Sequence, residues 1–179
     1  MEGATVSPRE IAVPVSVFGS LRRELTQEVG ALPTIHALHH AGYEAGSAGG
    51  QAFLGGPESV AGMGQSTFWA RLAGYFGRRG WGAIEHAGTW PGISLLKSTD
   101  WAEASEAEQD PDGSCHFSTG YLSGFLTELA GGPVAVLEVE CRSRGDQECR
   151  WAFGSEKVIH DLYGALLEGT PLDTALSAL

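Results

Sequence analysis

All three cysteines of the chain lie in its C-terminal half, and two of them flank a glycine symmetrically. Cys141 and Cys149 stand four residues on either side of Gly145, each within an apolar segment. A hairpin centred on Gly145 would place these cysteines opposite each other, with Cβ atoms about 5 Å apart. Two such thiolates can share one tetrahedral zinc ion, with Zn–S bonds of about 2.3 Å. Cys115 precedes the helix that leads into the first strand, so chain return can bring it alongside them.

A tetrahedral ion needs a fourth ligand, and the first of the two expected strands carries Glu138 and Glu140. Side chains alternate between the faces of a strand, so Glu138 points away from Cys141 unless the strand bulges or ends near Glu140. Glu140 itself and His116 are the other candidates. Spacing alone also allows a disulfide between Cys141 and Cys149, or three inert buried thiols.

Cysteine count and charge narrow the setting in which the chain works. An odd number of cysteines does not fit a secreted disulfide framework, and the N-terminus lacks the pattern of a secretory signal. We therefore expect a reducing, cytoplasmic compartment, where cysteine clusters usually bind metals or catalyse reactions. A net charge of -11 argues against nucleic acid or an anionic membrane surface as a partner. No segment approaches 18 uninterrupted apolar residues, so we expect no membrane span.

Hydrophobic periodicity divides the chain into an N-terminal arm, residues 1–16, and a single domain, residues 17–179. The expected helices cover residues 17–29, 33–41, 58–77, 120–130 and a last segment from 155 onward. The expected strands cover residues 81–88, 92–98, 134–141 and 148–153. Residues 42–56 could form either a helix or a loop, and the acidic residues 101–112 should form a surface loop. Hairpins outnumber βαβ units, which predicts an α+β fold with an antiparallel sheet of about four strands packed against helices.

Aromatic side chains gather in the part of the sequence expected to cover the sheet. Aromatic walls with few polar groups are typical of small-molecule pockets, although such rings also build ordinary cores. His86 could orient a hydroxyl or carboxylate of a ligand, or it could simply face solvent. The candidate ligand-binding residues are Phe68, Trp69, Tyr75, Trp81, His86, Trp90, Tyr121 and Phe125.

A separate group of histidines occurs earlier in the chain. His36 and His40 are four residues apart and so share one face of a helix, with His39 beside them. Such a group could bind a metal ion, but only Glu44 has a spacing that could complete it. A solvated helix face is the simpler interpretation.

The segment from Cys115 to Gly124, followed by Glu138–Cys141, Gly145 and Cys149, resembles the signature of the 4-vinyl-reductase (4VR) domain family. The resemblance covers residues 115–153 well and the earlier chain more loosely. Sensor domains of that family, including those of phenol-responsive transcription activators, hold zinc with a Cys, a Glu-x-x-Cys pair and a final Cys. The resemblance therefore implies that Cys115, Glu138, Cys141 and Cys149 are the ligands, and favours Glu138 over Glu140. Four protein ligands close the coordination sphere, so the zinc would be structural.

The same resemblance implies a fold of the NO-signalling and Golgi-transport ligand-binding type, homodimers formed through N-terminal helices, and an enclosed apolar or aromatic ligand. We find no nucleophile elbow, phosphate-binding loop or dinucleotide fingerprint. The sequence thus favours a non-enzymatic sensor or carrier. The alternatives are an accessory protein or reductase that acts on a vinyl group in tetrapyrrole (bacteriochlorophyll) metabolism, and an assembly subunit like those of the TRAPP vesicle-tethering complex.

Overall fold

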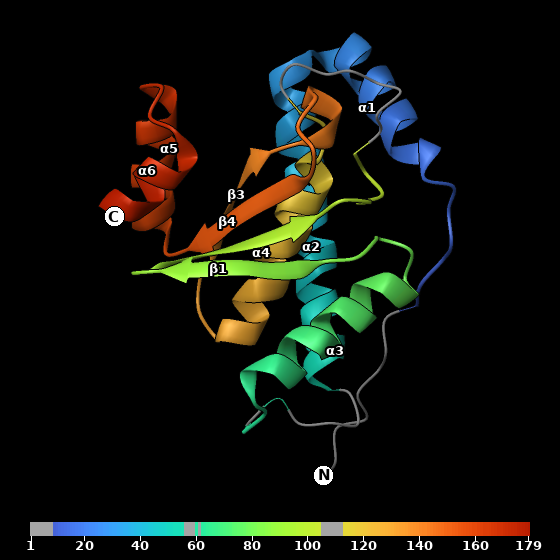
Figure 1. The fold of residues 1–179 in the computed structure, drawn as a ribbon. Coiled ribbons are helices and arrows are strands. Elements are labelled where there is room, and N and C mark those ends of the chain that lie inside the picture. Colours follow the sequence, from blue (N-terminus) through green and yellow to red (C-terminus); the bar gives the residue numbers. More distant parts are fainter. Residues whose placement is uncertain (1–8, 56–59, 61, 105–112) are drawn as a thin grey trace.

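Four short strands form one antiparallel sheet in the order β1–β2–β4–β3 (Figure 1). The computed structural model describes residues 9–55, 60, 62–104 and 113–179. The strands are β1 (Glu85–Trp90), β2 (Ile93–Ser98), β3 (Ala135–Glu140) and β4 (Cys149–Gly154). Each pair of neighbouring strands is antiparallel, and the expected hairpin joins β3 to β4 through Gly145, which adopts a left-handed conformation (φ 102). The predicted α+β class and four-stranded antiparallel sheet are confirmed.

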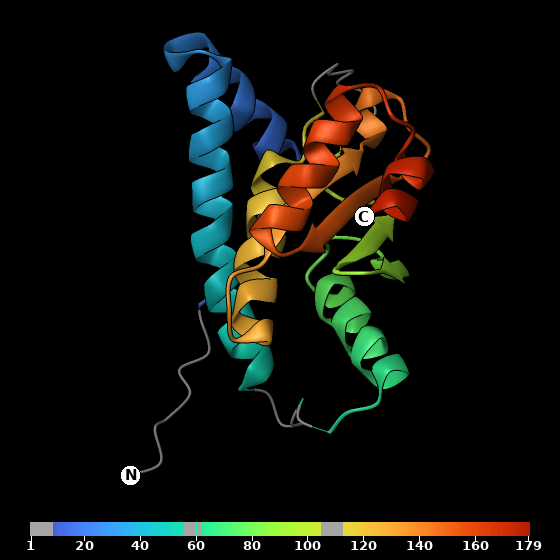
Figure 2. The same cartoon turned by 90° about the vertical axis from the view of Figure 1, so that its left-hand side faces the viewer.

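Helices cover both faces of this sheet (Figure 2). The helices are α1 (Ser16–Val29), α2 (Ala31–Leu54), α3 (Gln65–Arg78), α4 (His116–Ala130), α5 (Glu156–Leu167) and α6 (Leu172–Ala178), with a short 3-10 turn η1 (Arg142–Arg144). One core, which includes Phe76, Leu96, Phe125 and Trp151, lies between the sheet and α3 and α4. A second core around Leu95 and Leu162 joins the other face of the sheet to α5 and α6. No helix in the described part of the chain has the length and apolar character needed to cross a bilayer.

The most extensive helix contact joins α2 to α4, two helices far apart in the sequence that lie side by side (Figure 2). Glycines on both helices allow their backbones to approach closely. A Cβ atom on Gly42 would lie 2.9 Å from the amide nitrogen of Tyr121, and one on Gly124 would lie 2.9 Å from that of Ser47. Real Cβ atoms do not come so near a backbone atom, so only glycine fits these positions.

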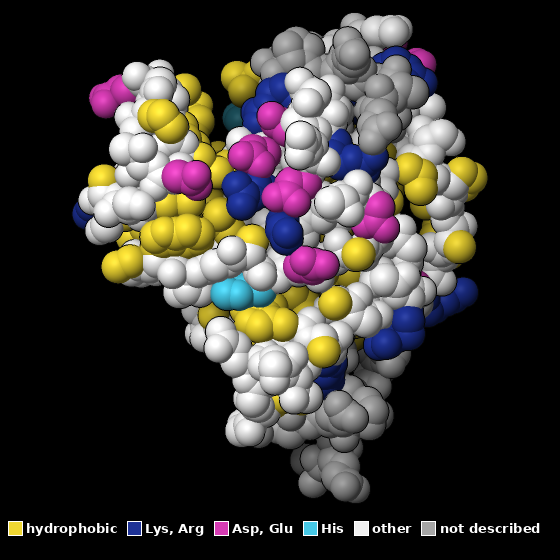
Figure 3. Space-filling view, in the orientation of Figure 1, with side chains coloured by type: hydrophobic (Ala, Val, Ile, Leu, Met, Phe, Trp, Pro, Cys, Tyr) yellow, Lys and Arg dark blue, Asp and Glu magenta, His cyan; other side chains and the backbone are white. Residues whose placement is uncertain are grey.

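Alternation along the strands separates an apolar row from a charged row. Leu96 and Trp151 pair across β2 and β4 and face the first core. One residue along, side chains of opposite charge pair across the sheet: Glu85 with Lys97 at 3.8 Å, and Arg150 with Glu140 at 3.5 Å. Figure 3 shows acidic and basic side chains interspersed on the face of the molecule that includes this region. Such partly exposed pairs specify the strand register more than they add to stability.

Three expectations change once the structure is known. Residues 42–54, which could have been a loop, continue α2 as a helix because their small residues pack on α4. The helix expected from residue 58 begins at Gln65, and residues 58, 59 and 61 lie outside the described residues. The expected surface loop is wrong for its first part, since Trp101, Glu103 and Ala104 are buried; residues 105–112 lie outside the described residues.

Candidate metal centre

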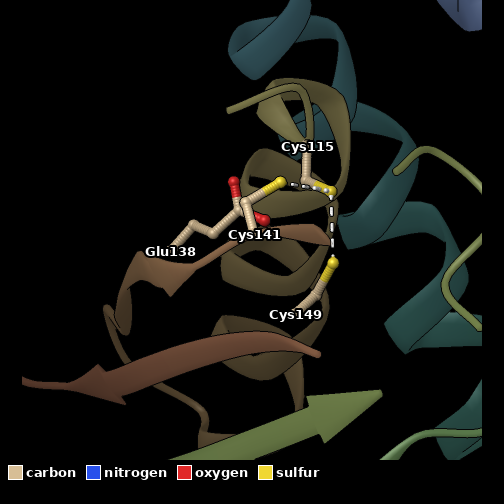
Figure 4. A group of neighbouring side chains, drawn as sticks. All are labelled: Cys115, Glu138, Cys141 and Cys149. Atoms are coloured by element: carbon tan, nitrogen blue, oxygen red, sulfur yellow. Dashed lines mark hydrogen bonds between the residues drawn. The ribbon is translucent and has the colours of Figure 1, made fainter. Parts of the chain in front are cut away.

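Three cysteines and a glutamate converge on one point beside the sheet (Figure 4). Cys115 comes from the N-terminus of α4, Glu138 from β3, Cys141 from the residue after β3, and Cys149 from the first position of β4. One ligand atom from each of the four lies within 4.8 Å of all the others. The three thiols are fully buried. The group is therefore compact enough to bind a metal ion.

A bulge in β3 aims Glu138 and Cys141 at the same point. The register of β3 against β4 shifts between Glu138 and Glu140, and the strand ends at Glu140. The extra residue, Val139, reverses the alternation of side chains that would otherwise separate Glu138 from Cys141. The bulge or strand end that the sequence required for a Glu138 ligand is present. Glu140 instead forms the ion pair with Arg150, away from the cluster.

The cysteines form no disulfide, and all three are free. Cys115 Sγ lies 3.9 Å from Cys141 Sγ and 4.0 Å from Cys149 Sγ. A disulfide needs an S–S distance near 2.05 Å. Sulfurs that bind one tetrahedral ion at about 2.3 Å are separated by about 3.8 Å, which is close to the spacing of these sulfurs.

Hydrogen bonds to the sulfurs favour a thiolate at the centre of the cluster. Contacts with Cys115 and Cys149, together with the Ser143 hydroxyl at 3.0 Å and the Ser114 backbone amide, lower the pKa of Cys141. Hydrogen bonding with Cys141 and Cys149, reinforced by burial, raises the pKa of Cys115. Thiolates are the metal-binding form of cysteine, and donors around them are common in metal sites.

Glu138 has an unsatisfied oxygen inside the cluster. Its Oε1 atom is buried and accepts no hydrogen bond from the protein. Burial raises the pKa of this carboxyl well above its ordinary value. Gly113 closes the site from the loop side, because a Cβ atom there would lie 3.3 Å from Glu138 Oε2 and 3.6 Å from Cys141 Sγ. A buried oxygen without a partner beside three thiols is the arrangement that a cation would complete.

Glu103 fixes the N-terminus of the helix that carries Cys115. Its carboxylate accepts hydrogen bonds from the backbone amides of Phe117 (3.0 Å) and Ser118 (2.6 Å) and from the Ser118 hydroxyl. Ser118 in turn accepts a hydrogen bond from Trp101 Nε1 at 2.7 Å. Glu103 therefore does the work of a helix cap, in place of the Ser118 or Thr119 cap expected from the sequence.

The buried carboxyl of Glu103 should make stability depend on pH. Burial raises its pKa to about 7 from 4.5, against the opposing effect of its hydrogen bonds from Ser118 and Phe117. The folded protein then binds more protons than the unfolded chain between these values, so unfolding free energy falls as pH rises through this range. We expect wild type to lose about 3 kcal/mol relative to Glu103→Gln between pH 4.5 and 7.

Urea unfolding of both proteins across this pH range measures the difference. Effects of the cysteine cluster are common to both proteins and cancel in the comparison. Parallel pH profiles for the two proteins would contradict the role given to Glu103.

Most of the aromatic candidates lie together in the first core. Phe68, Trp69, Tyr75, Trp81, Tyr121 and Phe125 all belong to it or pack against it. The Tyr75 hydroxyl lies 3.3 Å from the Tyr121 hydroxyl and donates to the carbonyl of Gly49. Trp90 is separate, since it packs with the second core on the opposite face of the sheet.

Trp69 and His86 form a stacked pair at the edge of the first core. Their ring centroids are 4.5 Å apart and their planes differ by 13°. His86 Nε2 lies 3.0 Å from Thr89 Oγ1, which fixes the ring. Trp69 Nε1 is buried and has no hydrogen-bond partner, so a donor faces the interior unsatisfied.

The other histidine group lies along α2. Ile35, His36, His39, His40 and Tyr43 line a hollow there, and burial, with His36 and His40 nearby, lowers the pKa of His39. In the described residues the cysteine cluster alone brings three or more potential metal-binding side chains together, so Glu44 does not complete a site with these histidines.

Comparison with known proteins confirms the family resemblance for one part of the chain. Residues 98–155 match the family model of the 4-vinyl-reductase (4VR) domain, and this range contains Glu103 and the whole cysteine cluster. No curated protein matches the chain significantly.

Two solved structures share the fold at low sequence identity. The phenol-responsive sensory domain of the transcription activator PoxR, with phenol, superposes with a TM-score of 0.67 at 16% identity, covering 92% of this chain and 85% of that one. A vinyl-4-reductase family protein from Methanocaldococcus jannaschii gives a TM-score of 0.55 at 20% identity, covering 81% of this chain and 83% of that one. Identities this low establish the shared fold alone.

Proposed function

We propose that this chain is a cytoplasmic sensor domain that binds a small aromatic or apolar molecule and carries one structural zinc ion. The observation that carries the proposal is the buried cluster of three cysteines and Glu138 within the segment that matches the 4VR domain. The similarity of fold to the phenol-responsive domain of PoxR supports a sensor over an enzyme.

Zinc suits the donors of the cluster better than other common ions. Thiolate sulfur is a soft ligand that selects zinc over calcium or magnesium, and the compact arrangement fits tetrahedral coordination. Cys115, Glu138, Cys141 and Cys149 would hold the ion, which would tie α4 to the β3–β4 hairpin. With four protein ligands no position remains for a reactive water, so the role is structural.

The ligand is proposed to bind beside Trp69, between α3 and β1. The unsatisfied indole N–H of Trp69 would donate to an oxygen of the ligand, and the surrounding rings of Phe68 and Phe125 would contact its apolar part. A phenol combines such an oxygen with an aromatic ring. The PoxR sensory domain was solved with phenol, which makes phenol the first compound to test.

Replacing Trp69 by phenylalanine removes the indole N–H and keeps an aromatic ring. We expect phenol, titrated by calorimetry, to bind wild type and to bind Trp69→Phe about 10-fold more weakly, the usual value of one buried hydrogen bond. Trp90→Phe is the matched control, because Trp90 lies on the opposite face of the sheet. Equal weakening by both substitutions, or no binding to wild type, would count against this site.

A homodimer is proposed on the evidence of exposed apolar side chains near the N-terminus. Ile11 is 86% exposed, and Val13, Val15, Val17 and Leu21 are also exposed along the arm and α1. Helix α1 buries none of its residues within one chain. A second copy would cover this surface and hold α1 in place.

The alternative proposal is an accessory role in tetrapyrrole metabolism. It is favoured by the similarity to the vinyl-4-reductase family protein. The same calorimetric titration with a vinyl-bearing tetrapyrrole in place of phenol separates the two. Tight binding of the tetrapyrrole together with no binding of phenol would favour this alternative.

A further inference from the structure

A cleft of about 360 Å³ lies between α1, α2 and the start of α4, away from the aromatic core. Figure 2 shows α1 folded back beside the upper part of α2. The polar groups that line the cleft come from all three helices: Arg22, Arg23, Thr26, Gln27, Thr34 and His116. Its volume falls within the range of small-molecule sites.

The charge of this cleft is opposite to that of the chain. The protein carries 22 acidic and 11 basic residues, with a net charge of -11. Among the described residues that line the cleft there is no aspartate or glutamate, while two are arginines and one is a histidine. Adjacent cations in a concave surface attract each other's counter-ion and repel one another without it. A cleft of this kind favours an anionic occupant.

The start of α4 does not itself supply the binding groups. The amides of Phe117 and Ser118 in its first turn already donate to Glu103. Recognition would therefore depend on the side chains of Arg22, Arg23 and His116. Guanidinium groups bind carboxylates and phosphates through paired hydrogen bonds, which gives them a preference for such planar or tetrahedral oxyanions.

An anion can exchange with neutral acceptors that these arginines contact. Arg22 Nη1 donates to the carbonyl oxygen of Gly113 at 3.3 Å, and Arg23 Nη2 donates to the hydroxyl of Ser20 at 3.2 Å. A hydrogen bond in which both partners are charged is stronger than one from a guanidinium to a carbonyl or hydroxyl, so an oxyanion competes well for these donors. We propose that this cleft is a second ligand site, which binds a small molecule through its carboxylate or phosphate group.

Calorimetric titration of the zinc-loaded full chain at low salt tests the proposal, with succinate and inorganic phosphate as separate probes. We expect at least one probe to bind at one site per chain with a dissociation constant below about 10 mM. The probe that binds distinguishes a carboxylate site from a phosphate site. Arg23→Met should weaken binding at least about 10-fold, because it removes a charge-assisted donor, and Arg22→Met/Arg23→Met should abolish it.

Lys157→Met is the matched control, since it removes one positive charge from α5 on the other side of the sheet. It should leave the affinity unchanged. Binding of neither probe to wild type overturns the proposal. Equal affinities in Arg23→Met and Lys157→Met would show a general response to net charge and would overturn it as well. Because Arg23 is exposed, its substitution should not disturb folding, and a circular dichroism melt verifies this.

Discussion

Replacing Gly46 by alanine is expected to lower the free energy of unfolding by more than about 4 kcal/mol, or to prevent folding. A Cβ atom on Gly46 would lie 2.7 Å from the carbonyl carbon and 2.8 Å from the Cα atom of Tyr121 in α4. These are backbone atoms in the middle of a helix, so they cannot rotate away as a side chain could. The two helices would have to separate, and the core contacts of Tyr121 and Phe125 would be lost along their length.

Gly77→Ala is the matched control for this prediction. Gly77 also lies inside a helix, but a Cβ atom there would meet nothing within 4 Å. Alanine is better than glycine in a helix by up to about 1 kcal/mol, so this variant should be as stable as wild type or more stable. Urea unfolding followed by circular dichroism measures both proteins. A Gly46→Ala protein of normal stability would mean that α2 and α4 do not pack as closely as described.

The close packing of α2 on α4 shows where sequence reasoning stops. The small residues from Gly42 onward suggested close approach to some neighbour, yet a loop explained them equally well. What settles the question is the second set of glycines, Gly120 and Gly124, in a helix about 75 residues later. Nothing local to either segment identifies the other as its partner.

The metal centre was more predictable because its geometry is local. Cys141, Gly145 and Cys149 belong to one hairpin, and the required bulge near Glu140 followed from the odd spacing of Glu138 and Cys141. Glu103 was missed, because it belongs to a run of acidic residues that has the composition of a surface loop. Trp101, two residues earlier, was the available signal, since a large apolar side chain at the start of such a loop tends to anchor it in the core.

Removing Cys115 should abolish metal binding and most of the stability that the metal provides. Its sulfur is the common neighbour of the other two, so its loss leaves no three-sulfur site. Zinc at a free concentration of about 1,000 times its dissociation constant stabilises a folded chain by about 4 kcal/mol. We expect wild type as purified to contain close to one zinc per chain, and Cys115→Ala to contain almost none and to be less stable by about this amount.

Stripping zinc from wild type with a chelator separates the metal from the side chain. If the ion is the source of stability, stripped wild type and Cys115→Ala should unfold at similar urea concentrations, and added zinc should restore only wild type. Metal content and unfolding are measured on the same samples. Metal-free wild type that unfolds like the untreated protein would reject a structural role for the ion.

The neighbouring glutamates of β3 test the identity of the fourth ligand. Glu138→Gln keeps the shape of the side chain but removes the charge next to the sulfurs, so zinc affinity should fall at least about 10-fold. Glu140→Gln is the matched control, because Glu140 pairs with Arg150 away from the cluster. Competition with a chromogenic chelator measures both affinities. Since the bulge at Val139 alone directs Glu138 toward the cysteines, a larger effect at Glu140 would mean that β3 follows regular alternation in solution, and that the fourth ligand is Glu140.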